Sequence, residues 1–352
     1  MTTLTAEPSR LERFTASGVF TVAAQEVRIR IRAGRWRWLL AIWTAVVIGF
    51  AVLLRLGLAG TDSVNSSNPA GPPLFGGTLL FVLGLALLVV PALTAQSVNG
   101  DRERGTLATL QVTRLSASEI GLGKLMAAWG AALIFLALTL PVIIWAMIEG
   151  GLPFLNVVVS LLVVSLLLGV VSAVSQAWSA LFARSITSAL VSYLTVFALT
   201  IGTLIAFGLA TALTTEARTF TYTDNGEDQT YTEQQARTDR TWPLLAPNPF
   251  VVLADAAPRL PEQHDPVTGE PLGRPLDPLG SLGDSVRDAR RGLDSQPATE
   301  ELNVAPTAPQ QPGPVWPWGL GFDVALGVGA AVITVRRLRM PVHKVGRGVR
   351  IA

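Results

Sequence analysis

Cysteine is absent from the 352-residue sequence, and histidine occurs only at His264 and His343. Without cysteine the chain forms neither disulfides nor thiolate metal sites. Both histidines lie outside every long apolar run, which excludes histidine-dependent chemistry inside a membrane. Charge is also scarce: charged residues make up 15% of the chain, against about 25% in soluble domains. Half of the residues are hydrophobic and the mean hydropathy is +0.45, so the composition indicates a membrane protein.

Uncharged apolar runs of about 20 residues recur along the chain, and a helix of that length crosses a hydrocarbon core about 30 Å thick. Soluble core helices seldom stay uncharged over such a length. The first five runs lie within residues 38–213, and the sixth is interrupted by Asp323. The sequence therefore predicts an all-α polytopic membrane protein with six transmembrane helices, at 38–58, 76–98, 125–148, 154–181, 186–213 and 316–335.

The positions of Lys and Arg orient these spans, because basic residues near span ends are retained on the cytoplasmic side. The leader, residues 1–37, holds seven arginines and is too extended for a cleavable signal peptide. Residues 59–75 contain no Lys or Arg, the connection at 99–124 is basic, and the turn at 149–153 is not. The tail, residues 336–352, carries six basic residues. We therefore expect both termini in the cytoplasm.

This orientation places residues 214–315 outside the cell, between the fifth and sixth spans. The segment carries eight arginines, sixteen acidic residues and fourteen of the 23 prolines. Proline argues against a continuous helix or a central strand, so we expect much of the segment to be extended or loosely folded. Two pieces are expected to be more ordered. Residues 281–293 have helical spacing, and the apolar residues 242–256 either dip into the membrane or pack on the span ends.

Residues 17–37 of the leader are predicted to form an amphipathic helix in the cytoplasmic interface, with its arginines near anionic headgroups. One helical side would carry apolar residues and another side arginines: Phe20, Ala24, Val27 and Ile31 on the first, Arg28, Arg32 and Arg35 on the second. The alternation VRIRIR at 27–32 also fits a strand. The helix is favoured because a strand here has no evident partner.

The connection between the second and third spans, NGDRERGTLATLQVTRLSASEIGLGK at 99–124, far exceeds the roughly two to eight residues that usually join helices. Within it, SASE from Ser116 to Glu119 is a predicted capping box. A helix starting there and reaching residue 148 would be about 48 Å long at 1.5 Å per residue. Its first turns would project beyond the bilayer and transmit force from a cytoplasmic partner. An ordinary solvated loop is the alternative.

The pattern D-R-E-R-G-T-L followed by T-x-L-S-x-x-E-I-x-x-G-K resembles the first cytoplasmic loop of ABC-2 type permeases, the membrane subunits of ATP-binding-cassette transporters. The six spans, the basic leader and the long connection before the last span agree with that family. Ala108 stands where an acid is frequent, and Arg114 where proline is frequent. The resemblance implies an ABC-2 type exporter arrangement in a bacterial plasma membrane, with an extracellular insertion between helices five and six.

In that family the loop contacts a separate nucleotide-binding subunit. The resemblance therefore implies ATPase-coupling roles for Asp101, Arg102, Glu103, Arg104, Gly105, Thr106, Leu107, Ser116, Glu119 and Lys124. The chain has no G-x-x-x-x-G-K-[ST] phosphate loop, so it would not bind and hydrolyse ATP by that route. We also expect no catalytic, cofactor or metal site in it. ATP and Mg would bind to the partner ATPase. A second permease chain, identical or related, and the lipid bilayer are the other expected partners; nucleic acid is not.

The implied function is export of a hydrophobic or amphipathic molecule. The alternative is a non-transporting membrane scaffold or sensor that acts through residues 214–315. A membrane-embedded enzyme is disfavoured, because the predicted spans hold no Ser-His, Asp-Asp or metal-ligand constellation.

Three charged residues, Arg55, Glu149 and Asp323, fall near the outer ends of the predicted spans. An ionisable group inside the bilayer is costly. We therefore expect Arg55 to pair with Glu149 or with Asp323; a direct role in substrate binding is the alternative.

Overall fold

The computed structural model describes residues 15–32, 34–60, 69–103, 115–224, 227–261, 263–264, 271–273, 276–292 and 313–339. The described chain is mostly helical. Six helical stretches in it are long and apolar enough to cross a membrane: Gly34–Ala59, Gly71–Glu103, Ala117–Ile148, Phe154–Leu181, Ser185–Leu213 and Trp316–Leu338. Each overlaps one of the six predicted spans, so six long apolar helices at these positions are confirmed.

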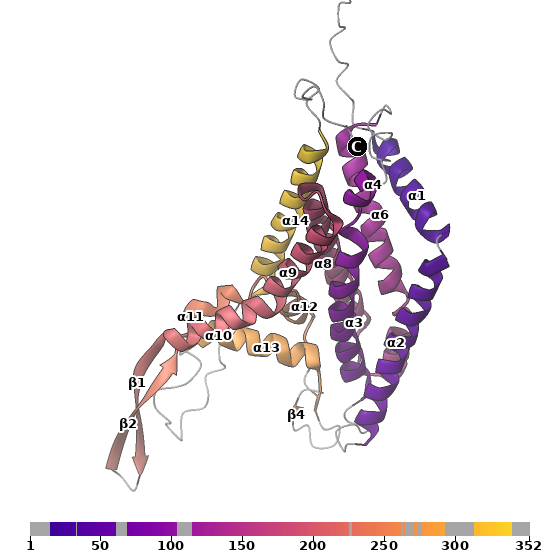
Figure 1. Cartoon of the computed structure of the whole chain (residues 1–352). Helices are drawn as coiled ribbons and strands as arrows, with labels where there is room; N and C mark the ends of the chain where they lie inside the picture. The colour runs from indigo at the N-terminus through magenta and orange to yellow at the C-terminus, as the bar shows by residue number, and fades with distance from the viewer. Residues whose placement is uncertain are drawn as a thin grey trace, which may run out of the picture.

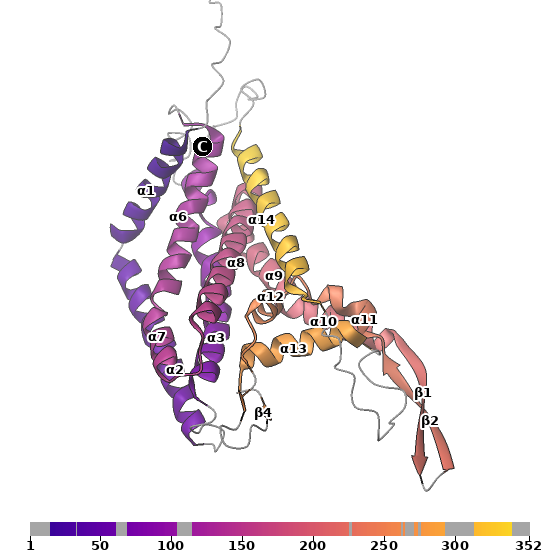
Figure 2. The same ribbon diagram turned by 180° about the vertical axis from the view of Figure 1, so that it is seen from behind.

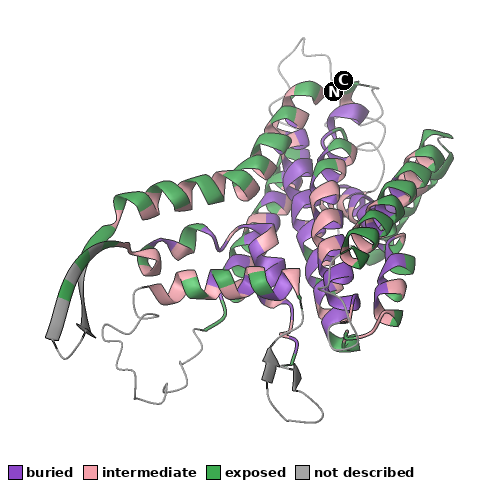
Figure 3. Cartoon of the chain, turned by 90° about the horizontal axis from the view of Figure 1, so that it is seen from below, coloured by how far each residue is buried: buried purple, intermediate pink, exposed green. Residues whose placement is uncertain are grey.

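Three helices form the centre of the bundle: α3 (Gly71–Thr94), α6 (Ala117–Ala137) and α8 (Phe154–Leu181) (Figure 1). They carry most of the buried side chains of the main core (Figure 3). The last span, α14 (Trp316–Leu338), packs against α8 and α6 (Figure 2). Gly327 permits this packing, since a Cβ there would lie 3.3 Å from the Val170 Cα. Small residues at helix contacts are typical of membrane bundles.

The third span is broken between α6 and α7 (Leu140–Ile148). Pro141 stands in the first turn of α7, and its missing N–H ends the α6 ladder. The tight connection from α7 to α8 follows, with positive φ angles of 89° at Gly150 and 75° at Gly151. Only glycine adopts such angles without strain, which allows the chain to reverse direction so that α8 packs against α3 and α6.

The fifth span consists of α9 (Ser185–Phe197), the π-helical turn η1 (Ala198–Gly202) and α10 (Thr203–Leu213). It slants away from the bundle (Figures 1 and 3). The most apolar stretch of this span has no buried residue, whereas 61% of the corresponding stretch of the fourth span is buried. The π-helical turn is contacted by Asn248, whose Nδ2 donates a hydrogen bond to the Thr200 carbonyl at 2.7 Å.

The segment between α10 and α14 begins with an antiparallel hairpin, β1 (Thr215–Asp224) and β2 (Glu227–Ala236), in which Thr215 pairs with Ala236. The hairpin extends beyond α10, away from the bundle (Figure 1). It departs from the predicted all-α fold and corrects the expectation of a loose segment here. The physical reason is local: residues 215–236 contain no proline and are rich in β-branched threonine, so they are free to pair.

The rest of that segment holds α11 (Thr238–Thr241), the 3₁₀ turn η2 (Trp242–Leu244), α12 (Pro249–Ala256), α13 (Pro278–Arg291) and the short strand pair β3 (Gln263–His264) and β4 (Pro271–Gly273). Val252 and Leu253 of α12 are fully buried in the same core cluster as Leu167 of α8. The apolar piece at 242–256 thus packs on the span ends, one of its two predicted placements. The helix expected at 281–293 is α13, which starts three residues earlier because Asp277 caps it.

The leader forms the helix α1 (Ala16–Arg32), followed by α2 (Gly34–Ala59), so the helical interpretation of VRIRIR is confirmed. Its buried residues differ from the apolar side expected from the sequence. Val19 and Val22 are buried where α1 packs on α6, whereas Phe20 and Ile31 are exposed. The helix therefore presents one apolar side to the protein and a second to its surroundings.

Candidate functional site

The predicted coupling connection starts with α4 (Asn99–Glu103), which is attached to the end of α8. The Ser179 hydroxyl oxygen accepts hydrogen bonds from the backbone N–H groups of Val98 and Asn99, both at 3.1 Å. These are N–H groups at the start of a helix, which have no partner within it. Because one serine satisfies two of them, the end of the second span is joined to the fourth.

Two motif residues extend this attachment to the fifth span. Glu103 Oε1 accepts from the Ser185 hydroxyl at 2.6 Å, and Ser185 is the first residue of α9. Arg102 Nη1 donates to the Phe182 carbonyl at 3.4 Å, in the turn between α8 and α9. The connection is therefore docked on the spans that follow it.

The other end of the connection forms the predicted capping box. The Glu119 N–H donates to the Ser116 hydroxyl at 3.2 Å, and the Ser116 N–H donates to Glu119 Oε2 at 2.7 Å. Glu119 also reaches α1: its Oε1 accepts from the Thr15 N–H at 2.8 Å and from the Thr15 hydroxyl. One carboxylate thus caps α6 and holds the start of α1.

Lys124 is the last residue of the connection, and it contacts the first part of it. Its side chain is only 1% exposed and forms ion pairs with Asp101 of α4 and Glu26 of α1. We call Glu26, Asp101 and Lys124 the lysine node. A buried ammonium is tolerated only when it is paired and hydrogen-bonded. The lysine node therefore joins α1, α4 and α6 at one end of the bundle.

Glycine allows α1 to lie directly on α6 beside the node. A Cβ at Gly123 would lie 2.6 Å from the Val22 Cβ and 2.8 Å from the Val19 carbonyl oxygen. Both separations are below normal van der Waals contact, so a larger residue would push the helices apart. The leader helix and the third span consequently form one packed unit.

Six of the ten predicted coupling residues are placed by the structure at this end of the bundle: Asp101, Arg102, Glu103, Ser116, Glu119 and Lys124. Arg104, Gly105, Thr106 and Leu107 lie outside the described residues. The partners Thr15 and Glu26 were not predicted. A signal existed for Glu26, the only acidic residue between Glu12 and Asp62.

The three predicted membrane charges are separated by the structure into a pair and a single residue. Arg55 Nε lies 2.9 Å from Glu149 Oε1, which also accepts from Trp145 Nε1 at 3.2 Å. This is one of the two expected pairings. The other does not form: Asp323 is 1% exposed, and neither carboxylate oxygen has a hydrogen-bond partner in the described part of the chain.

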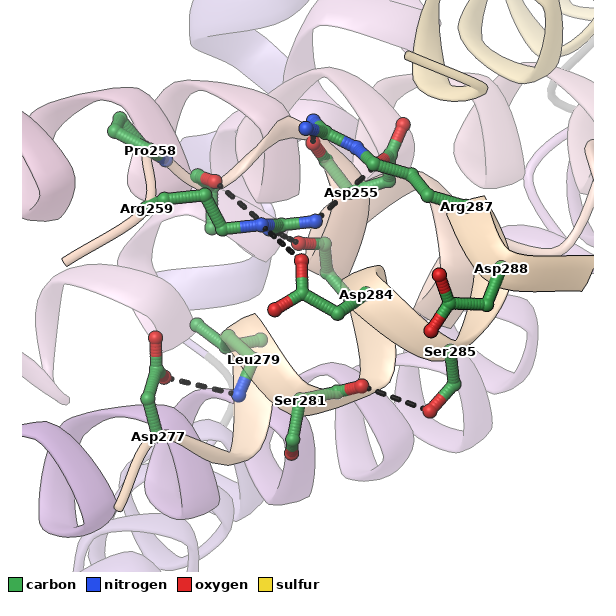
Figure 4. Close-up of polar contacts among 12 residues, drawn as sticks. Asp255, Pro258, Arg259, Asp277, Leu279, Ser281, Asp284, Ser285, Arg287 and Asp288 are labelled. Carbon is green, nitrogen blue, oxygen red and sulfur yellow. Dashed lines mark hydrogen bonds and ion pairs between the residues drawn. The ribbon is translucent and has the colours of Figure 1, made fainter. Parts of the chain in front are cut away.

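A second polar cluster, not predicted, surrounds Asp255 at the opposite end of the bundle. Its side chain is fully buried, and Arg287 Nε donates to Oδ1 at 2.5 Å (Figure 4). Oδ2 accepts from the N–H groups of Val315 and Trp316, at 2.6 and 2.7 Å. Asp255 therefore joins α12 and α13 to the start of α14. An acid inside the apolar run VVLADA was the available sequence signal.

Neighbouring charges complete this cluster. Arg259 Nε donates to Asp284 Oδ1 at 2.8 Å, and the Leu279 N–H donates to Asp277 Oδ1 at 3.1 Å (Figure 4). Burial raises the pKa of Asp277, and the backbone hydrogen bonds it accepts act in the opposite direction. These contacts order the helices at this end.

Both clusters consist of ion pairs and capping bonds that join helices. Over the described ranges, no three His, Asp or Glu side chains are grouped so that they could hold a metal ion. Comparison of the chain with protein-family models, with curated proteins and with solved structures finds no match.

Proposed function

We propose that the chain is the transmembrane permease subunit of an ATP-binding-cassette exporter of the ABC-2 type. It would move a hydrophobic or amphipathic molecule, using ATP hydrolysis by a separate nucleotide-binding subunit. The motif between the second and third spans supports this function, and the observation that carries it is the lysine node. Two residues of that motif, Asp101 and Lys124, form the node together with Glu26 of the leader helix.

The contacts around the node support a mechanical role for the connection. Asp101 and Lys124 join it to α1 and α6, while Glu103 and Arg102 attach it to the start of α9 and the preceding turn. A displacement applied to the connection would therefore reach the leader helix and the third and fifth spans together. That is the requirement for converting the movement of an ATPase into a rearrangement of spans.

The exposed fifth span supports the expected second permease chain. Its apolar side chains include Leu190, Leu194 and Leu209, each more than 60% exposed. A face of this kind, lying off the bundle, suits a pathway formed between two chains that face one another. Lipid would cover the face in a single chain.

Orientation is tested by cysteine labelling, which is straightforward because the chain has no cysteine of its own. Gln111→Cys introduces a thiol into the connection, and Gln234→Cys introduces one on β2. With a membrane-impermeant maleimide on intact cells, we expect Gln234→Cys alone to be labelled and both to be labelled after permeabilisation. The reverse pattern would place the connection outside the cell and contradict the proposal.

The partner is tested by gentle purification from the native membrane, where a companion polypeptide with a phosphate-binding loop is expected. In the reconstituted complex, Glu103→Arg should leave ATP hydrolysis intact but abolish transport, because it breaks the contact with Ser185. Gln234→Arg, a charge added on the distant hairpin, is the control. Consistent absence of a companion would favour a scaffold acting through the projecting hairpin.

A further inference from the structure

A pocket of about 330 Å³ lies at the same end of the bundle as the lysine node, between α1, α2 and the end of α3. Two arginines, Arg30 and Arg35, line it. Apolar surface comes from Ile29, Trp36 and Leu93, which belong to three different helices. Its volume falls in the range of about 300–1,000 Å³ that small-molecule sites occupy. The lining combines cationic with apolar groups, which suits an amphipathic anion.

Two polar groups of this lining lack partners. Arg30 Nη1 and the Ser97 hydroxyl oxygen are buried, and neither has a hydrogen-bond partner within the described ranges. Burial lowers the pKa of Arg30, opposed by the charge of Glu26 one helical turn away. Buried donors without acceptors are costly. An anion with several acceptor oxygens would satisfy them, and the planar guanidinium matches phosphate oxygens especially well.

The acidic residues of the pocket do not repel such an anion strongly. Glu26 and Asp101 also line the pocket, but both carboxylates are paired with Lys124. The cations Arg30, Arg35 and Lys124 outnumber these two carboxylates, so the region carries a net charge of +1. Lys124 itself is buried and does not line the pocket, whereas Arg30 and Arg35 do. The two arginines are therefore the cations that the lining presents to an anion.

The position of the pocket identifies the source of the anion. It lies where the first span begins at Gly34 and the second ends at Glu103. Lipid phosphates lie at that depth, just beyond the hydrocarbon core. We propose that this pocket binds the phosphate group of an anionic membrane phospholipid, with the first part of its acyl chains against Ile29, Trp36 and Leu93. Soluble phosphate shares the headgroup chemistry but has nothing to place on the apolar lining.

The test compares two double variants of the full-length chain with the same charge change. Arg30→Gln/Arg35→Gln removes the pocket cations, whereas Arg28→Gln/Arg32→Gln removes two exposed cations of α1. Purified chains are loaded into nanodiscs of phosphatidylglycerol and phosphatidylcholine, extracted, and examined by native mass spectrometry for retained lipid. We expect the wild type and the exposed-arginine variant to retain phosphatidylglycerol. The pocket variant should bind it about tenfold or more weakly, because it loses the charge-assisted hydrogen bonds of two guanidinium groups to the phosphate.

Each other outcome overturns the proposal. Equal loss in both double variants would mean non-specific attraction by the leader, and no loss in the pocket variant would leave the pocket without a role. Displacement of phosphatidylglycerol by inorganic phosphate at equal concentration would assign the site to soluble phosphate. The wild type supplies a test that no folding defect can obscure: equal retention of phosphatidylglycerol and phosphatidylcholine would refute the proposal. The measurement needs no ATPase partner, so it succeeds or fails independently of the proposed transport function.

Discussion

Lys124 and Asp101 form a buried ion pair, although 23 residues of sequence separate them. The pair joins the two ends of the connection between the second and third spans. Glu26 of the leader helix also pairs with Lys124. The two residues near the ends of this long, charged connection are thus buried against one another, rather than exposed to solvent along a loop.

Replacing Lys124 tests the energetic weight of this node. Lys124→Met keeps the length of the side chain but leaves two carboxylates, Asp101 and Glu26, without their cation. We expect the free energy of unfolding to fall by about 3 kcal/mol, as for other broken buried pairs. Thermal unfolding in detergent measures it. The exposed Arg28→Met is the control and should change stability by less than about 0.5 kcal/mol. Similar values for the two variants would show that the node contributes little.

The pair between Arg55 and Glu149 should be measurable as a coupling energy. Both side chains are partly exposed, at 29% and 23%, so the pair is weaker than the lysine node. We expect a double-mutant cycle with Arg55→Met and Glu149→Gln to give a coupling of about 1 kcal/mol. Additive effects of the two substitutions would contradict the pairing.

Two buried aspartates offer a matched comparison, because the same substitution should destabilise the chain at one position and not at the other. Asp255 accepts hydrogen bonds from two backbone N–H groups and an arginine, whereas the oxygens of Asp323 accept none in the described chain. Asp255→Asn should lower the free energy of unfolding by about 3 kcal/mol. Asp323→Asn should leave it unchanged or raise it by about 1 kcal/mol, since the carboxyl group that it removes has no hydrogen-bond partner in the described chain.

Thermal unfolding of both variants in one detergent provides the measurement, and equal destabilisation would contradict the difference in their surroundings. Transport then separates the two interpretations of Asp323. Unchanged transport by a stable Asp323→Asn variant would favour a structural role, and loss of transport with full stability would favour contact with the substrate.

The pH dependence of stability should carry a contribution from Asp277. Burial raises its pKa above the usual 3.8, so the folded chain holds this proton more tightly than the unfolded chain. The contribution is fully present below the unfolded pKa and is lost as the pH rises through the raised one. Asp277→Asn keeps an oxygen for the Leu279 N–H and removes the titration. The wild type should lose stability relative to this variant as the pH rises above about 4.

Unfolding midpoints of the wild type and Asp277→Asn, measured over a pH series, test this directly. Taking the difference cancels the titration of all other carboxylates. A difference that does not vary with pH, or one that favours the wild type at higher pH, would show that the pKa is not raised.

Local patterns in the sequence were sufficient to predict several elements of the structure. The six spans depend on apolar length alone, and the capping box depends on Ser116 and Glu119 being three residues apart, so both are visible without tertiary information. The proline count of residues 214–315 was misleading, because it averages over the segment. Proline is absent from 215–236, where the hairpin forms. A composition describes a region, whereas strand pairing depends on the few residues that pair.

The contacts between helices were decided only by the tertiary structure. Lys124 meets Glu26 across 98 residues, and Asp255 meets Val315 across 60; no local spacing predicts either pair. For Arg55 the sequence left two acids open, and the packing of α2 beside α7 selected Glu149, while Asp323 is buried with no hydrogen-bond partner among the described residues. The physical reason is common to all three. Sequence determines which residues a helix carries on each side, but the partner of a buried charge depends on which helix packs against that side.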